Sequence, residues 1–302
     1  MVSCINRSKK MKKIYIYVFA VIVFFIFTAP LLWLIICSLQ NDANLLSVPP
    51  NILPKDPTLI NYYQLLLGRN PEGITDEIGI KSYSVPREAK IFPQAILNSF
   101  IVGIGTTLLC LASGTFSAYA LARLKFIGSR KYLFLVLATR MIPGLTLAIP
   151  FFLIAKSYGL IDKKITLIII NASFTLPYTI WLLKGFFEAI PRDIEDAARV
   201  DGCTKFQTIY KIILPLSKPG LVGTGIFAFM LSWNEFFYAL LLTNTEKSFT
   251  IPIVLSMFGT ELDINYSLMI TAGVVAIIPP ILFTLIFQKY IVEGITAGSI
   301  KG

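Results

Sequence analysis

Charged residues with regular spacing are concentrated between residues 190 and 215, in the stretch IPRDIEDAARVDGCTKFQTIYKIILP. Acidic and basic side chains are mixed there, and a plain lipid-facing patch would not need those acids at fixed spacing. The stretch is therefore a candidate working surface. The chain contains no histidine, which removes imidazole bases, histidine-ligated metals and histidine proton relays. Its four cysteines have no CxxC spacing and predict neither a disulfide framework nor a metal site.

The stretch 190–215 predicts a helix, a glycine turn and a second helix. Pro191 suits a first helical turn, and Gly202 supplies the turn. Thr204 and Gln207 form an S/T-x-x-Q capping box that starts the second helix. Helical spacing places four apolar side chains on one face of that helix, namely Phe206, Ile209, Tyr210 and Ile213. The residues themselves leave two interpretations open: an amphipathic pair on the membrane surface, or a docking element for a groove on a partner.

Six apolar segments must position this stretch. Of the 302 residues, 55% are hydrophobic and only 15% are charged, whereas soluble proteins have about 25% charged residues. A bilayer is crossed by roughly 20 apolar residues in a helix, so each segment is long enough to span it. We therefore expect an all-α membrane protein with six transmembrane helices, and we exclude a soluble enzyme. The segments are 14–39, 94–122, 132–155, 165–186, 220–242 and 268–291.

Two features of these segments predict how the helices pack. Gly114, Ala118 and Ala122 recur every four residues in the second segment, and such a stripe of small side chains allows two helix backbones to approach closely. Prolines inside the spans remove helix hydrogen bonds and predict kinks. They are Pro143, Pro150, Pro177, Pro279 and Pro280.

The distribution of Lys and Arg predicts that both termini lie inside. The net charge is +10, and the N-terminal tail and the 187–219 loop each carry five basic residues. Basic residues are enriched in inner loops, so the excess indicates topology and not nucleic-acid binding. The basic turn at residues 156–164 is an exception. The predicted parts are an inner tail (1–13), a transmembrane domain (14–291) with an external loop (40–93) and a cytoplasmic loop (187–219), and an inner tail (292–302).

The cytoplasmic loop resembles the signature of a known family. Asp196-Ala197-Ala198, three residues, Gly202, nine residues, and then Ile212-x-Leu214-Pro215 is similar to the EAA loop, EAA-x3-G-x9-I-x-LP. That loop marks the permease subunits of binding-protein-dependent ABC importers. Asp196 stands where the family usually has Glu, which keeps the carboxylate but shortens its reach by about one methylene.

Other segments extend the resemblance to about residues 10–302. AYALAR at 118–123 and WNEF at 233–236 are similar to stretches of the same family. The tail at 294–302, GITAGSIKG, is similar to the G-x-TAG-x-x-KG ending of its carbohydrate branch. Six spans is also the size of the smaller permease of the maltose transporter. The external insert at 68–93 does not align with the family.

The resemblance implies an ATP-driven importer in which this chain binds no cofactor. No G-x-x-x-x-G-K-[ST] motif occurs, so ATP and Mg would be bound by partner ATPase subunits. The implied partners are an ABC ATPase dimer, a second and different permease, an external sugar-binding protein and the lipid bilayer of a bacterial or archaeal cytoplasmic membrane. Asp196 would pair with a basic residue of the ATPase, and Gly202 would set the angle between the helices. The implied coupling residues are Glu195, Asp196, Ala197, Ala198, Asp201, Gly202, Ile212, Leu214 and Pro215.

Polar residues inside the spans are candidates for the translocation path, because they are costly in a membrane. Arg140 could contact substrate or pair helices, or it could snorkel or bind a neighbouring carbonyl. Glu235, beside Trp233 and Asn234, could contact a sugar or form an inter-helix hydrogen bond. Asn98 and Asn171 are expected to be structural.

Two other classes of protein remain as alternatives. A secondary transporter or channel would not need an EAA loop, and its paired repeats with coupling-ion carboxylates are not visible. An intramembrane enzyme would need a convergent nucleophile and base, which the histidine-free chain does not offer.

Overall fold

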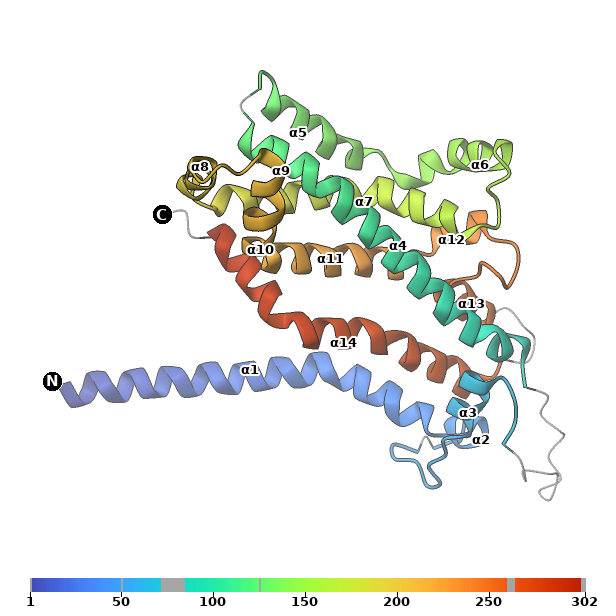
Figure 1. Ribbon diagram of the computed structural model, residues 1–302. Helices are drawn as coiled ribbons and strands as arrows, with labels where there is room; N and C mark the ends of the chain where they lie inside the picture. Colours follow the sequence, from blue (N-terminus) through green and yellow to red (C-terminus); the bar gives the residue numbers. More distant parts are fainter. Residues whose placement is uncertain (1, 50, 72–84, 125, 260–263, 300–302) are drawn as a thin grey trace. The chain divides into compact units, whose positions relative to one another are not determined.

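The computed structural model describes residues 2–299 except 50, 72–84, 125 and 260–263, and it describes side chains from residue 13 to residue 290 (Figure 1). All regular structure in the described residues is helical, which confirms the predicted all-α class. The helices are α1 (Val2–Ser38), α2 (Asp42–Leu45), α3 (Ile60–Leu67), α4 (Arg87–Arg123), α5 (Ser129–Ala138), α6 (Ala148–Ser157), α7 (Lys164–Ala189), α8 (Arg192–Val200), α9 (Lys205–Thr208), α10 (Leu214–Leu216), α11 (Lys218–Trp233), α12 (Phe237–Leu242), α13 (Ile251–Met257) and α14 (Tyr266–Ser299). Short 3-10 turns, η1 (Thr139–Met141) and η2 (Gly144–Leu147), lie between α5 and α6, and a π-helical turn, η3 (Ile209–Ile213), joins α9 to α10.

The six predicted spans appear as four single helices and two broken ones. Four helices are long and apolar enough to cross a membrane alone: Lys13–Ser38, Arg87–Arg123, Lys164–Ala189 and Tyr266–Tyr290. The third span is bent by 85° between Ser129–Met141 and Gly144–Ser157. Pro143 lies at this bend and has no N–H to continue the helix. In the fifth span, α11 follows a bend of 77° after Leu216 and stops at Trp233, before α12 begins.

One compact unit comprises residues 1–90 and 258–276. Its polar contacts gather at the end of α1, where the Ser38 carbonyl accepts a hydrogen bond of 3.0 Å from Asn61 Nδ2. Asp42 Oδ1 caps α14 by accepting from the Ser267 N–H at 2.7 Å. Large apolar side chains of α1, such as Phe19 and Phe27, are exposed within this unit, as lipid contact requires.

The other compact unit comprises residues 91–257 and 277–302, and its core lies between α4 and α7. Ala118 and Ala122 of α4 are buried against apolar side chains of α7, including Leu183 and Phe187. At position 114, an added Cβ would lie 2.7 Å from Thr179 Cγ2, so only glycine permits this approach. The predicted stripe of small residues is therefore confirmed as a helix contact.

A network of hydrogen bonds around Asp162, called here the Asp162 network, lies at one end of this second unit. Its carboxylate accepts from the N–H groups of Asn244 and Thr245, at 2.8 and 3.0 Å, and from the hydroxyls of Thr245 and Ser248. Burial alone would raise the pKa of Asp162, but these hydrogen bonds stabilise the charged form and lower the pKa to about 2. The Asp162 network thereby connects the loop after α12 to the turn before α7.

Candidate functional site

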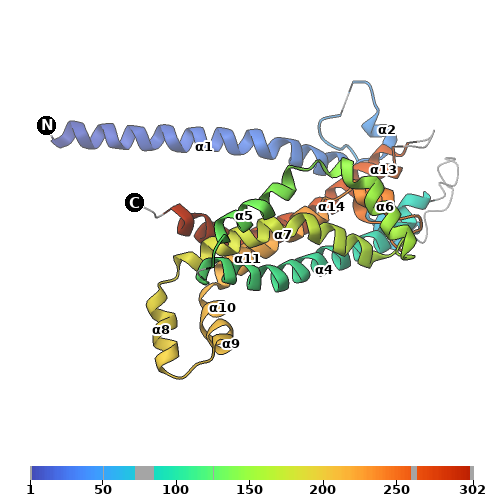
Figure 2. The ribbon, with the colours of Figure 1, turned by 90° about the horizontal axis from the view of Figure 1, so that it is seen from above.

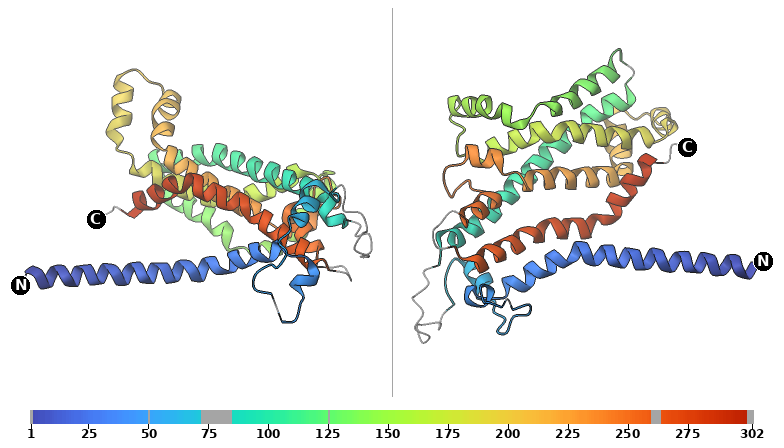
Figure 3. Two further views of the ribbon diagram at one scale, coloured as in Figure 1. Left: turned by 90° about the horizontal axis from the view of Figure 1, so that it is seen from below. Right: turned by 180° about the vertical axis from the view of Figure 1, so that it is seen from behind.

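The helix pair at residues 190–216 protrudes from the long helices of its unit, with α8 and α9 side by side (Figure 2 and the left panel of Figure 3). Gly202 has φ +83°, a left-handed conformation that glycine adopts without strain, and it reverses the chain after α8. Thr204 and Gln207 form the predicted capping box, because Thr204 Oγ1 accepts from the Gln207 N–H and Gln207 Oε1 accepts from the Thr204 N–H. The predicted helix–turn–helix is therefore confirmed.

A buried ion pair anchors the helix pair to α4. Arg123 Nε lies 2.5 Å from Glu195 Oε1, and both side chains are almost fully buried. The Tyr119 hydroxyl donates to Glu195 Oε2 at 3.0 Å, and Arg123 Nη2 donates to the Ile190 carbonyl at 2.8 Å. Two segments that the sequence singled out separately, 118–123 and 190–215, thus meet at one site. Glu195 faces the protein interior, so its contribution is to position α8.

The remaining coupling candidates differ in exposure. Asp196 is exposed and forms a 3.2 Å ion pair with Arg199 one turn further along α8. Ala197, Asp201, Gly202 and Pro215 are also exposed, Ile212 and Leu214 are half-buried, and Ala198 is buried. The helix pair exposes apolar side chains as well: the exposed fraction is 89% for Val200, 67% for Phe206 and 57% for Tyr210, whose ring also packs edge-on against Phe116 of α4.

The prediction that four apolar residues share one face of the second helix is wrong. Ile209 and Ile213 are buried, whereas Phe206 and Tyr210 point to the surface. The π-helical turn at residues 209–213 changes the number of residues per turn directly after α9. Residues spaced for a continuous α-helical face therefore separate into a buried pair and an exposed pair.

A second candidate site is the bend cavity, a space of about 500 Å³ beside the break in the third span. Arg140 reaches into it from η1, and its guanidinium carbon lies 4.8 Å from the ring centroid of Tyr178 and 5.5 Å from that of Phe174. Phe174 in turn stacks on Tyr238, with centroids 5.1 Å apart. The lining residues are Arg140, Ile142, Pro143, Gly144, Leu145, Asn171, Phe174, Thr175, Leu231, Glu235, Phe237 and Tyr238.

Glu235 lines the bend cavity and also caps the helix that follows it. Its two carboxylate oxygens accept from the N–H groups of Tyr238 at 2.7 Å and Ala239 at 3.0 Å, in the first turn of α12. The bond between helices comes instead from the Tyr238 hydroxyl, which donates to the Gly144 carbonyl at 2.6 Å. The two breaks, in the third and fifth spans, are therefore joined directly.

The other two predicted path residues lie elsewhere. Trp233 is buried and packs on Phe100 and Phe229, with ring centroids 4.9 and 5.4 Å away. Asn234 is exposed and donates to the Met230 carbonyl at 2.9 Å. Neither lines the bend cavity, because the chain turns between Trp233 and Glu235 and only Glu235 faces the break.

The asparagines predicted to be structural differ in how completely they are bonded. Asn98 donates to the Phe249 carbonyl at 2.9 Å and accepts from Lys164 Nζ at 3.0 Å, which is a structural role. Asn171 donates to Ser232 Oγ at 2.9 Å, but its buried Oδ1 has no partner among the described residues. Sequence reasoning missed Phe174 and Tyr238 as cavity residues, because an aromatic residue in an apolar span looks the same whether it faces lipid or a cavity.

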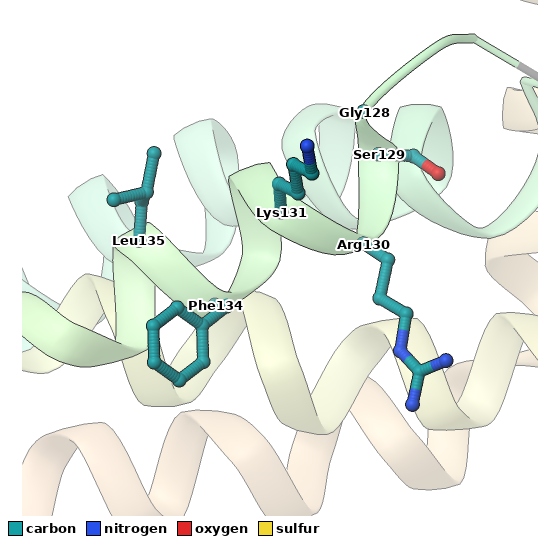
Figure 4. Close-up of a pocket in the computed structure, with 6 residues that line it drawn as sticks. All are labelled: Gly128, Ser129, Arg130, Lys131, Phe134 and Leu135. Atoms are coloured by element: carbon teal, nitrogen blue, oxygen red, sulfur yellow. The ribbon is translucent and has the colours of Figure 1, made fainter.

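A shallow surface hollow of about 710 Å³ lies at the start of α5, lined by Gly128, Ser129, Arg130, Lys131, Phe134 and Leu135 (Figure 4). Its two basic side chains point in opposite directions from the helix, so they do not converge on one ligand. In the described part of the chain, no group of three or more Cys, Asp or Glu side chains is placed to hold a metal ion.

Four helices can each cross a membrane alone, and the bent third span and the interruption between α11 and α12 lie beside a polar cavity. Together with a protruding helix pair, these features are typical of the transmembrane subunit of a transporter. Residues 111–297 match the family described as the binding-protein-dependent transport system inner membrane component. The chain belongs to this family.

Relatives and solved structures agree with this assignment. The trehalose/maltose transport system permease protein MalG of Thermococcus litoralis is 30% identical over 98% of this chain and 99% of its own length. The sulfoquinovosyl glycerol transport system permease protein SmoH of Agrobacterium fabrum is 33% identical over 90% and 88%. The fold is similar to a chain of a bacterial ABC transporter involved in the import of alginate, with TM-score 0.74, 24% identity and coverage of 94% and 98%.

Proposed function

We propose that this chain is the permease subunit of an ATP-driven importer that moves a sugar or oligosaccharide by alternating access. Relatives that match nearly the whole chain are named for transport of trehalose and maltose or of a sulfoquinovosyl glycoside, which supports a saccharide as cargo. An external binding protein would deliver that cargo. A second permease subunit, which is a different chain, would complete the translocation path.

The observation that carries the proposal is the helix pair at residues 190–216. It is held to α4 by the buried pair of Arg123 and Glu195, while the apolar side chains of Val200, Phe206 and Tyr210 stay exposed. Apolar side chains at this exposure are typical of a surface that a partner covers. Asp196 adds an exposed carboxylate for a basic partner residue. We assign this surface to an ATPase subunit of the importer.

The same proposal fixes the orientation and the place of ATP. With the helix pair on the cytoplasmic side, the N- and C-termini also lie inside and the 40–93 loop lies outside, in a bacterial or archaeal cytoplasmic membrane. ATP and Mg belong to the ATPase dimer, and this chain binds no cofactor and no nucleic acid. The residues of 1–13 and 292–302 form the inner tails of one transmembrane domain, 14–291.

Transport by the reconstituted complex tests the energy source. We expect uptake of labelled sugar into proteoliposomes to require both ATP and the binding protein, and to be unaffected when a proton or sodium gradient is collapsed. Uptake that follows an ion gradient without ATP would contradict the proposal and favour a secondary transporter.

Gly202 tests the docking surface. Replacing Gly202 by valine places a β-branched residue at φ +83°, which strains the turn although a Cβ there meets no atom within 4 Å. We expect Gly202→Val to insert in the membrane but to lose the ATPase during purification. Gly159→Val is the matched control, because Gly159 also has a positive φ of +62° and open surroundings but lies in the turn between α6 and α7.

A different result for this pair would identify the alternative role. If Gly202→Val retains its ATPase while both variants lose stability equally, the helix pair is not the docking element. An amphipathic pair on the membrane surface would then account for its exposed apolar side chains.

A further inference from the structure

The bend cavity contains polar groups that the protein itself leaves unused. Arg140 Nε and Asn171 Oδ1 are both buried, and neither has a hydrogen-bond partner among the described residues. Both residues line the same space of about 500 Å³. A buried polar atom without a partner costs free energy, and such atoms are rare in folded proteins. Two of them in one cavity indicate a ligand that supplies their partners.

The charge of Arg140 is the stronger of these signals. No carboxylate among the described residues lies within ion-pair distance of its guanidinium. Glu235 is the acidic residue that lines the bend cavity, and both of its oxygens are engaged by the N–H groups of α12. The rings of Phe174 and Tyr178 attract the cation but provide no negative charge. A guanidinium in this situation is suited to bind an anionic group through its planar fork of donors.

The rest of the cavity is suited to a sugar ring. Phe174 and Tyr238 stack on each other and form an aromatic wall, and the Phe151 ring packs edge-on against both. The apolar face of a pyranose packs on such rings, while the free Asn171 Oδ1 can accept a hydrogen bond from a sugar hydroxyl. The volume lies within the range of about 300–1,000 Å³ that small-molecule sites occupy.

We propose that the bend cavity binds an anionic saccharide, with a carboxylate or sulfonate on Arg140, a hydroxyl on Asn171 Oδ1 and the ring against Phe174 and Tyr238. The inference rests on the proposed function as a saccharide permease and narrows its cargo to acidic sugars. Arg140 is the residue that selects the charge, and Asn171 and the aromatic wall select the sugar.

A matched pair of ligands tests the inference in the intact complex. The importer, reconstituted in lipid nanodiscs, is titrated with digalacturonate and with its methyl ester, which has the same rings but no negative charge. We expect the free acid to bind the native complex about tenfold or more tightly than the ester, the ratio that a charge-assisted hydrogen bond can provide. In Arg140→Gln the two ligands should bind within about twofold of each other, and Arg140→Lys should keep part of the preference.

A second pair of variants separates charge recognition from general damage. Lys156→Gln removes an exposed positive charge from α6, outside the cavity lining, and should leave the preference for the acid unchanged. Asn171→Ala should weaken the binding of the acid and of the ester by the same factor. Failure of the native complex to prefer the acid, or an equal preference in Arg140→Gln, would overturn the inference. ATP-dependent uptake is a separate measurement, so a failure of this inference can be distinguished from a failure of the proposed function.

Discussion

The helix pair at residues 190–216 and the bend cavity satisfy their polar groups in opposite ways. In the helix pair, the buried carboxylate of Glu195 has Arg123 and Tyr119 as partners, and the side chains left exposed are apolar. In the bend cavity the walls are aromatic, and the atoms left without partners are polar. A surface that binds a folded protein exposes hydrophobic area before the partner is bound. A cavity that binds a polar small molecule instead leaves hydrogen-bond donors and acceptors free for the ligand. The difference fits the two proposed roles, energy coupling for the helix pair and cargo binding for the bend cavity.

The largest expected effect comes from breaking the anchor of the helix pair. Glu195→Ala leaves Arg123 buried without its partner, which costs about 3–5 kcal/mol. We expect a large fall in the thermal unfolding temperature and loss of the ATPase from the purified complex. The double variant Arg123→Met with Glu195→Leu removes both charges and should recover most of the stability. If Glu195→Ala unfolds at the same temperature as the native protein, the ion pair does not anchor the helix pair.

The Asp162 network lies outside both sites and serves as a reference for variants in them. It holds the end of α12, which forms one wall of the bend cavity. Replacing Asp162 by alanine removes hydrogen bonds to a charged group and should destabilise the protein by about 2 kcal/mol. Ligand binding in the bend cavity should weaken, whereas ATPase retention through the helix pair should not change. Equal loss of both activities would show that the two sites are not independent.

The stability that the Asp162 network contributes depends on pH in a definite direction. The pKa of Asp162 in the folded protein, about 2, lies below the ordinary value of 3.8, so the folded state holds fewer protons than the unfolded state in that range. The contribution to stability is complete above about pH 4 and is lost as the pH falls towards about 2. We expect the difference in unfolding temperature between the native protein and Asp162→Asn to shrink over this window. A difference that stays constant from pH 7 to pH 2 would contradict the assignment.

A smaller effect is expected for the bond that joins the two helix breaks. Tyr238→Phe removes the hydroxyl that donates to the Gly144 carbonyl and should cost about 1 kcal/mol. The aromatic wall of the bend cavity keeps its shape, so sugar affinity should change less than in Asn171→Ala. Thermal unfolding measures the loss of stability in Tyr238→Phe, and ligand titration compares the sugar affinity of the two variants. A larger loss of affinity in Tyr238→Phe than in Asn171→Ala would contradict the arrangement of the cavity.

The smallest effect on stability is expected at the exposed carboxylate of the helix pair. Asp196→Ala breaks only a surface ion pair with Arg199 and should change stability by less than about 0.5 kcal/mol. ATPase stimulation by cargo should nevertheless fall, because this side chain is assigned to the partner. Asp193→Ala, an exposed acid on the same helix, is the control, and equal loss in both variants would remove the special role of Asp196.

The sequence predicted local structure well where it depends on neighbours along the chain. The Gly202 turn and the capping box of Thr204 and Gln207 appear as expected, because the residues that form them lie within a few positions of each other. The contact of Ala118 and Ala122 with α7 was also foreseeable, since small side chains at four-residue spacing permit close packing.

The parts that the sequence did not predict depend on contacts between distant residues. Glu195 and Asp196 are adjacent acids, and only the position of Arg123 decides that the first is buried and the second exposed. Trp233 and Glu235 were grouped by proximity, but the break after α11 directs them to different surroundings. A π-helical turn, which has no strong sequence signal, likewise divided the expected apolar face of the second helix.

The proposed contact between the tip of the helix pair and an ATPase subunit is tested most directly by photo-crosslinking in the assembled importer. A photoreactive amino acid is placed at Val200, at the tip, and as a control at Tyr158, which is 76% exposed in the turn after α6. We predict a cross-link to the ATPase from position 200 and none from position 158. No cross-link from position 200, or an equal one from both positions, would contradict the account.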